Sequence, residues 1–251
     1  MKLVIIGGTG LIGSKLVAKL REHGHAAVAA SPNTGVNTLT GEGLADVLQG
    51  ASVVVDVSNS PSFEDAAVME FFTTSTHNLV EHATAAGVRH YVALSVVGTG
   101  KILDSPYLRA KSAQEALIRS SGIPYSIVHA TQFFEFVKRI ADAATVGTTV
   151  RLPAALIQPM AADDVAKAVG RIAIGTPVNG TIEVAGPQQF RFDELIRQGL
   201  GARKDPREVV VDPHARYFGA ELGERSLIPA DQAQLGEMRF QDWLNQPASP
   251  R

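Results

Sequence analysis

The chain contains no cysteine. This absence excludes disulfides, thiolate metal sites, iron–sulfur clusters and cysteine nucleophiles. An excess of one charge sign is also missing, because 23 Lys and Arg residues nearly balance 25 Asp and Glu residues and leave a formal net charge of −2. Without a basic field, nucleic acid and anionic membranes are not expected as partners. The histidines lack metal-ligand spacing, so no metal site is predicted.

Long apolar runs are lacking too. The first one ends at Gly7 after four residues, which is too short for the core of a signal peptide. No run of about 18 apolar residues follows that could span a membrane. The sequence therefore predicts a soluble, cytoplasmic protein. Its 251 residues fit one large domain or two small ones.

Short apolar runs alternate with longer helical patterns over the first 130 residues. Repeats of this kind imply right-handed crossovers and a parallel sheet with helices on both faces. The expected strands are Leu3–Gly8, Ala26–Ala30, Ser52–Val57, His90–Val97 and Pro124–Ala130, and the expected helices are Ile12–His23, Glu64–Ala86 and Pro106–Ser121.

The alternation weakens after residue 132. Asp163–Gly175 is expected to be a helix that Asp163 and Asp164 cap, while Thr181–Ala185 and Val209–Val211 are expected to be strands of a smaller unit. The predicted fold is α/β, with a doubly wound parallel (Rossmann) sheet in residues 1–150. Residues 151–251 are expected to return partly to that domain and to form a small α/β substrate region.

A glycine-rich turn, Gly7-Gly8-Thr9-Gly10-Leu11-Ile12-Gly13, connects the first strand to the first helix. Its glycines permit a tight turn, close approach of a phosphate to the backbone, and close packing of helix on strand. The helix N-terminus then offers free N–H groups to a pyrophosphate. In the order strand, turn, helix, this pattern predicts a dinucleotide site.

The end of the second strand indicates which dinucleotide is preferred. A carboxylate there would accept a hydrogen bond from the ribose 2′-hydroxyl of NAD. The segment 29–34 has no carboxylate, and Ser31 with its neighbours offers small polar donors to a 2′-phosphate. The sequence therefore predicts NADP(H) in preference to NAD(H).

Tyr107 and Lys111 are four residues apart on an expected helix and share one face of it. An ammonium group near a phenol stabilises the phenolate and lowers the tyrosine pKa. Such a tyrosine can give a proton to a reacting carbonyl, and Lys111 can also bind the nicotinamide ribose.

These motifs and several others together resemble the NmrA-like group of atypical short-chain dehydrogenases/reductases. The resemblance runs through the first 136 residues and is specific for the fold more than for the substrate. It rests on the glycine-rich turn and on the segments His77–Val88, His90–Ser95, Tyr107–Lys111, Gly122–Val128 and Gln132–Phe136, with Met160–Ala168 resembling a later helix of the family.

The resemblance implies roles for particular residues. The catalytic group would be Tyr107, Lys111 and Ser95, with Ser95 facing the nicotinamide. The serine or threonine usual in these reductases is replaced by Val96 and Val97, so Ser95 substitutes for it or the triad is incomplete. The implied cofactor-binding residues are Gly7, Thr9, Gly10, Leu11, Ile12, Gly13, Ser31, Ser58, Asn59, Ser95 and Lys111.

Substrate contacts are expected just beyond the fifth strand. Phe133 and Phe134, with Phe136, are predicted to form an apolar wall beside the nicotinamide, although core packing is expected for at least one of the three. His129 is either a substrate contact or a buried, hydrogen-bonded histidine.

Three functions fit these features. In the first, a reductase passes hydride from the cofactor to a small carbonyl or quinone compound and Tyr107 donates the proton, although a quinone can take it from solvent. The second is a non-catalytic NADP(H)-binding redox sensor, and only this function calls for a protein partner. The third is a sugar-nucleotide epimerase or dehydratase, which the short, apolar C-terminal part disfavours.

Overall fold

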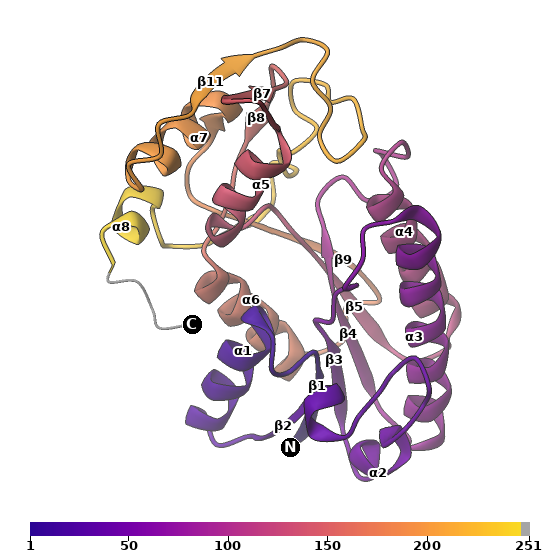
Figure 1. Ribbon diagram of the computed structural model, residues 1–251. Coiled ribbons are helices and arrows are strands. Elements are labelled where there is room, and N and C mark those ends of the chain that lie inside the picture. Colours follow the sequence, from indigo (N-terminus) through magenta and orange to yellow (C-terminus); the bar gives the residue numbers. More distant parts are fainter. Residues whose placement is uncertain (247–251) are drawn as a thin grey trace.

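A computed structural model of the chain describes residues 1–246. Its centre is a seven-stranded parallel sheet in the order β12-β9-β5-β4-β3-β1-β2 (Figure 1). The strands of this sheet are β1 (Lys2–Ile6), β2 (Ala26–Ala30), β3 (Val53–Asp56), β4 (His90–Val96), β5 (Tyr125–Ala130), β9 (Gly180–Ala185) and β12 (Gln234–Leu235).

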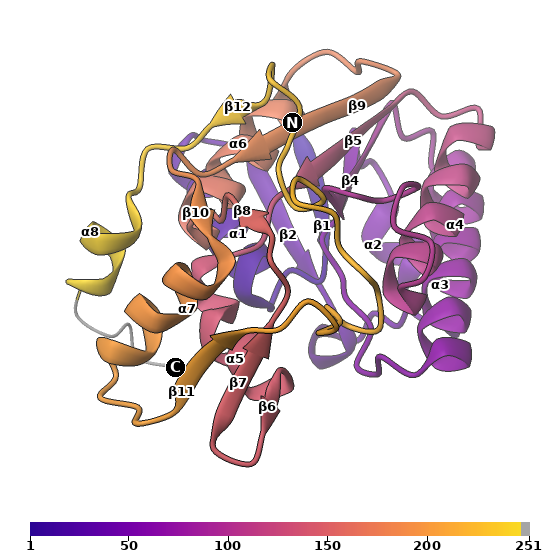
Figure 2. The same cartoon turned by 90° about the horizontal axis from the view of Figure 1, so that it is seen from above.

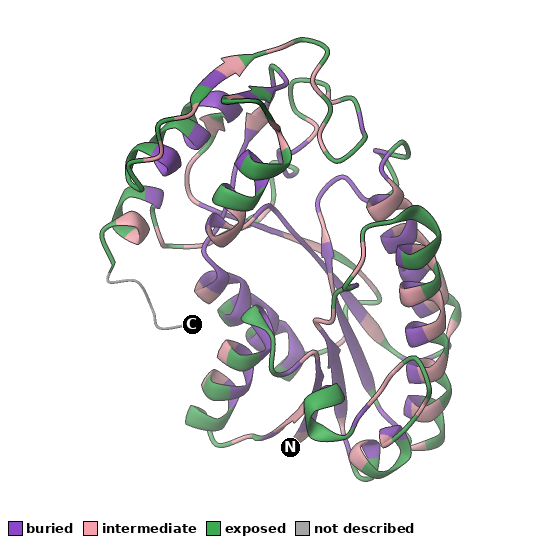
Figure 3. Cartoon of the chain, in the orientation of Figure 1, coloured by how far each residue is buried: buried purple, intermediate pink, exposed green. Residues whose placement is uncertain are grey.

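Helices cover both faces of this sheet because side chains of each strand alternate between two cores. Leu3 and Ile5 of β1 face α1 (Leu11–Glu22) and α6 (Ala162–Ile174). Val4 and Ile6 face the opposite core, built with residues of α2 (Leu44–Leu48), α3 (Asp65–Ala85) and α4 (Pro106–Ser120). The central strands are accordingly buried along nearly their whole length (Figure 3). The α/β, doubly wound parallel fold is confirmed.

The strand order creates a switch point at β1. The chain passes from β1 to β2 on one side, and the next strand, β3, pairs with β1 on the other side. In open α/β sheets, ligands bind outside the carboxyl ends of the strands at such a point.

A smaller unit with a separate core lies over that end of the sheet (Figures 1 and 2). Phe134, Phe192 and Phe240 fill its centre. Two small sheets, β11-β7-β6 and β10-β8, contribute to it. Its elements are η2 (Phe134–Phe136), α5 (Val137–Ala143), β6 (Thr145–Val146), β7 (Thr149–Leu152), β8 (Leu156–Ile157), β10 (Phe190–Arg191), α7 (Phe192–Gly201), β11 (Glu208–Val211) and α8 (Phe240–Leu244).

Two expectations about the second half of the chain are wrong. The strand at 181–185 belongs to the main sheet, because β9 pairs in parallel with the free edge of β5. Asp163 and Asp164 do not cap α6, which has Ala161 at its N-cap without a side-chain bond. Asp163 instead forms ion pairs with two lysines of α1. Asp164 accepts hydrogen bonds from the backbone N–H groups of Glu237 and Met238.

Candidate cofactor and substrate site

A cavity of about 780 Å³ opens at the carboxyl ends of the strands. This volume suits a small organic ligand or a cofactor. The glycine-rich turn and the end of β2 form one part of its wall. The ends of β3, β4 and β5 form the floor, and α5 with the loop around Tyr217 closes the other part.

The glycine-rich turn is shaped by close backbone contacts. Gly7 has a φ of 76°, and a Cβ there would lie 2.9 Å from the Ser58 backbone. A Cβ on Gly13 would lie 2.1 Å from the carbonyl oxygen of Gly7. These two glycines are therefore required for the turn to pack against β3 and for α1 to begin where it does.

Gly10 has a different role, because a Cβ at this residue would meet only the Gly7 oxygen, at 3.3 Å. It is the N-cap of α1 and supplies no side-chain bond to the helix. Among residues 1–246, no acceptor is found for the N–H groups of Leu11, Ile12 and Gly13. An open backbone approach beside free helix N–H groups fits the pyrophosphate of a dinucleotide.

Ser31 directly follows β2, as the sequence predicts, and is buried. The Thr9 hydroxyl donates to the Ser31 hydroxyl at 3.1 Å, and the Ser31 N–H donates to the Thr34 hydroxyl. Within the described part of the chain, no acidic side chain lines this end of the cavity. A 2′-phosphate here would meet hydroxyl and amide groups, without carboxylate repulsion.

The end of β3 carries a buried carboxylate that the sequence reading missed. Asp56 is 1% exposed and accepts hydrogen bonds from the Ser58 N–H and hydroxyl and from Gln114 Nε2. Ser58 and Asn59 line the cavity beside it. Asp56 thus fixes the segment that is expected to pass under the cofactor.

Lys111 is placed differently from the sequence prediction. It lies on α4 with Tyr107, but its ammonium donates to the carbonyl oxygen of Leu94 at 2.8 Å and to Gln114 Oε1. It also lies 4.5 Å above the ring of Phe72. Lys111 is 2% exposed and does not line the cavity, so the expected contact with a nicotinamide ribose is not available in this arrangement.

Tyr107 does line the cavity, but its acidity is opposite to the expectation. Burial of the phenol and the nearby Asp56 carboxylate raise the pKa of Tyr107 well above its ordinary value. Burial lowers the pKa of Lys111 to about 8, against the attraction of Asp56 and Glu115. The neighbouring ammonium therefore does not turn Tyr107 into a stronger acid.

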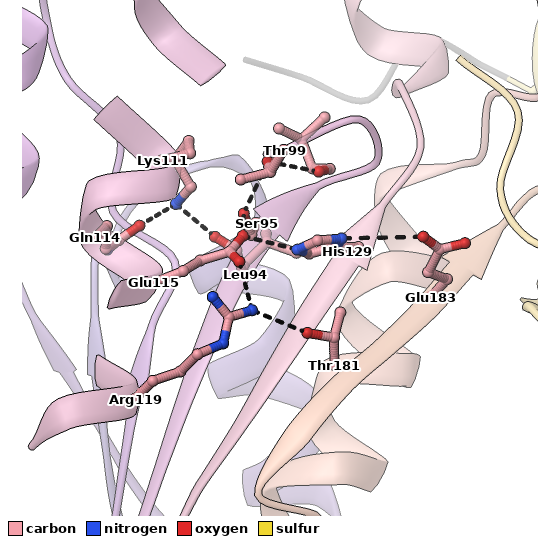
Figure 4. A network of polar contacts seen from close by, with 11 residues as sticks. Leu94, Ser95, Thr99, Lys111, Gln114, Glu115, Arg119, His129, Thr181 and Glu183 are labelled. Carbon is pink, nitrogen blue, oxygen red and sulfur yellow. Dashed lines mark hydrogen bonds and ion pairs between the residues drawn. The ribbon is translucent and has the colours of Figure 1, made fainter. Parts of the chain in front are cut away.

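Ser95 lies at the cavity floor and connects it to a buried polar network (Figure 4). Its hydroxyl donates to Glu115 Oε1 at 2.6 Å, and His129 Nε2 lies 2.7 Å from the same oxygen. Arg119 pairs with the other oxygen of Glu115 at 2.9 Å. Burial alone would raise the pKa of Glu115, but the bonds from His129 and Ser95 and the charge of Arg119 outweigh it and lower that pKa. The network thus holds an ionised carboxylate behind Ser95.

The residues predicted to contact substrate divide into two groups. Phe133 and Phe136 line the cavity and stack with ring centroids 5.3 Å apart. Phe134 is absent from the cavity wall and packs in the small core, 5.0 Å from the Phe240 ring. His129 belongs to the Glu115 network, so the buried alternative describes it.

The comparison with family models decides how the glycine-rich turn is to be understood. A model described as NAD(P)H-binding matches residues 7–173, from the turn to the end of α6. The chain belongs to this NAD(P)H-binding family. The family match confirms that the chain is an NAD(P)-binding Rossmann protein, as its resemblance to the NmrA-like group implies.

Relatives of this NAD(P)H-binding protein include the photosystem II assembly factor Ycf39 from two organisms. The protein from Synechocystis sp. is 22% identical over 218 residues, which cover 78% of this chain and 66% of the relative. That from Cyanophora paradoxa is 25% identical over 168 residues, covering 59% of this chain and 52% of the relative. The chain thus spans about half to two thirds of the length of these curated relatives.

Solved structures show the same fold at low sequence identity. MoeE5 in complex with UDP-glucuronic acid and NAD is 18% identical, with a TM-score of 0.75 and coverage of 97% of this chain and 96% of the other. The dTDP-glucose 4,6-dehydratase DesIV from Streptomyces venezuelae, with NAD bound, is 17% identical, with a TM-score of 0.74 and coverage of 96% and 94%. These structures share the fold of this family member.

Several cavity residues of this NAD(P)H-binding protein were missed by the sequence reading. Phe63, Arg139, Tyr217 and Phe218 all line the wall opposite the glycine-rich turn. They come from loops and from α5, and no spacing in the sequence connects them. Within residues 1–246, no cluster of three or more potential metal ligands is present, and no helix is long and apolar enough to cross a membrane.

Proposed function

We propose that this protein is an NAD(P)H-dependent reductase of a small, largely apolar carbonyl or quinone compound. The observation that carries the proposal is the continuity of one cavity from the glycine-rich turn to a chamber walled by aromatic side chains. A cofactor whose pyrophosphate lies on the turn extends along the carboxyl ends of the strands toward Ser95. The remaining chamber is then the space for the acceptor.

When bound, the cofactor supplies a hydride. The protein binds and orients the cofactor and shields the acceptor from water. The free N–H groups at Leu11 and Ile12 hold the pyrophosphate, while Ser58 and Asn59 support the cofactor from below. Aromatic walls such as Phe133 exclude water from the acceptor and favour a flat apolar molecule. We further propose NADP(H) over NAD(H), because the wall near Ser31 presents hydroxyl donors and no carboxylate.

Between the two acceptor classes, the site favours a quinone. A carbonyl becomes an alkoxide, a strong base that requires a well-placed acid. Tyr107 faces the cavity with a raised pKa and without help from Lys111, and the Ser95 hydroxyl is directed to Glu115. A quinone gives a delocalised aromatic oxyanion, which is a much weaker base, and its proton can come from solvent.

The test is steady-state loss of NADPH absorbance with a panel of quinones and aromatic aldehydes. Removal of a general acid costs about 10²–10⁴-fold in rate. We expect Tyr107→Phe to lower quinone turnover by less than about tenfold, with Tyr125→Phe, at the far end of β5, as the matched control. A loss of about 10²-fold or more on quinones in the Tyr107 variant alone contradicts the solvent-proton route.

A second function, a non-catalytic NADP(H)-binding sensor, is supported by one structural feature. Val96 and Val97 line the cavity where a hydroxyl is usual in related reductases, and Lys111 is withdrawn from it. The relatives named as assembly factors are also compatible with a role in binding. Cofactor binding without turnover of any acceptor in the panel, together with capture of a protein partner in only one redox state, establishes this function in place of the reductase.

A further inference from the structure

Three aromatic side chains from separate segments, Phe63, Tyr107 and Phe218, form an aromatic group in the wall of the cavity's chamber. The Phe63 ring centroid is 5.6 Å from that of Tyr107, in a tilted arrangement, and 6.4 Å from that of Phe218, on which it stacks. Phe218 has a φ of 45°, a left-handed conformation that is costly for a bulky residue. This conformation holds its ring edge-on to Tyr217 at 4.8 Å. Such strain is kept where the surrounding structure needs the side chain in place.

One cation stands beside this aromatic group. Among the residues that line the cavity in the described chain, 1–246, Arg139 is the one charged side chain. Its guanidinium carbon lies 4.6 Å from the Phe63 ring centroid. A guanidinium that stacks on a ring by its face keeps its N–H edges available for a planar acceptor.

Within residues 1–246, no carboxylate oxygen lies within 4.0 Å of the Arg139 guanidinium, so Arg139 has no acidic partner there. Its neighbour on α5, Lys138, does have one. Lys138 pairs with Asp142 at 2.7 Å, and Asp142 also pairs with Arg207 at 2.9 Å. Arg139 therefore introduces an uncompensated positive charge at the edge of an otherwise uncharged, apolar chamber.

We propose that this chamber binds an aromatic anion, with the ring against Phe63, Tyr107 and Phe218 and a carboxylate on the guanidinium of Arg139. The proposal deepens the proposed function by adding a carboxylate to the aromatic acceptor. It rests on that function only for the position of the cofactor on the glycine-rich turn, which leaves this end of the cavity open. A carboxylate can accept two parallel N–H bonds from Arg139.

The experiment is calorimetric titration with 2-naphthoate and with its neutral isostere 2-naphthamide, in the presence and absence of saturating NADP⁺. We expect the wild-type protein to bind the acid at least about tenfold more tightly than the amide. Arg139→Met, which keeps an unbranched stem against Phe63, removes this preference and leaves amide binding unchanged. Arg139→Lys restores part of it, and Lys138→Met, which removes a cation outside the cavity, keeps all of it.

The inference is overturned by equal affinities for acid and amide, by absence of binding of either, or by a preference that survives in Arg139→Met. It is also overturned if Arg139→Met weakens NADPH binding by about tenfold or more, since Arg139 then belongs to the cofactor site. These titrations require no turnover. A protein that prefers naphthoate through Arg139 but never oxidises NADPH would refute the reductase function and leave the anion site in place.

Discussion

Gly10→Ala separates cofactor binding from folding at the glycine-rich turn. The residue has φ −80° and ψ −176°, which alanine adopts without strain, and the new Cβ meets only the Gly7 oxygen at 3.3 Å. A shift of a few tenths of an ångström relieves that contact. Replacing glycine also restricts the unfolded chain, which stabilises by about 0.4–1 kcal/mol where the conformation is compatible. We therefore expect the free energy of unfolding to change by less than about 1 kcal/mol.

The same methyl group occupies the space through which a pyrophosphate approaches the backbone. We expect NADPH to bind at least about tenfold more weakly, a loss of about 1.4 kcal/mol or more. The matched variant is Gly13→Ala, in which the Cβ would lie 2.1 Å from the Gly7 oxygen and 2.7 Å from Gly8 Cα. Both contacts are with backbone, so this variant is expected to lose about 3 kcal/mol of stability.

Urea unfolding without cofactor and calorimetric titration with NADPH measure the two effects. The reasoning fails if Gly10→Ala binds NADPH as tightly as the wild type, because the pyrophosphate is then not on this turn. It also fails if the Gly10 and Gly13 variants are destabilised equally, because the steric distinction between the two glycines is then wrong.

Three further predictions concern buried and surface charges. Burial lowers the folded pKa of Lys111 to about 8, whereas the unfolded value is about 10.4, so the unfolded chain binds more protons between these two pH values. The free energy of unfolding therefore rises with pH over this range, by up to about 3 kcal/mol. Urea unfolding of Lys111→Met is expected to show no such rise. Glu115→Gln is expected to cost about 1–3 kcal/mol at neutral pH. Since the folded pKa of Glu115 is lowered, this cost should begin to shrink as pH falls below the unfolded value of about 4.3, and it should be lost as pH falls through the folded pKa. A pH-independent cost contradicts the ionised network. Asp163→Asn removes ion pairs of a carboxylate that is 45% exposed, and should cost less than about 1 kcal/mol in thermal unfolding.

The fold and the cofactor end of the site could be predicted because their causes are local in the sequence. The glycine-rich turn carries its own geometry in the spacing of Gly7, Gly10 and Gly13. The first five strands are short apolar runs bounded by turns, and they form where expected. Strand β9, which lies between β12 and β5, was assigned to the wrong sheet because its apolar pattern does not show which neighbours it pairs with.

The chamber end of the site depends on contacts between distant residues. The spacing of Tyr107 and Lys111 is correct for one helix face, yet the ammonium donates to Gln114 on the same helix and to the carbonyl oxygen of Leu94 on β4. The contact with Leu94 joins two elements, and a search for pairs on a single helix does not include it. His129 meets Glu115 because β5 and α4 pack together. Arg139 of α5 meets Phe63, which lies in the loop before α3. Such partners are determined by tertiary packing, and a single sequence does not reveal them.

Calorimetric titration of cofactor-free protein with NADPH and then with NADH tests whether the glycine-rich turn binds a dinucleotide. We expect micromolar or tighter binding of NADPH and binding of NADH weaker by at least about tenfold. Absence of binding of both nucleotides would contradict the claim that the glycine-rich turn and the cavity beside it form a working dinucleotide site.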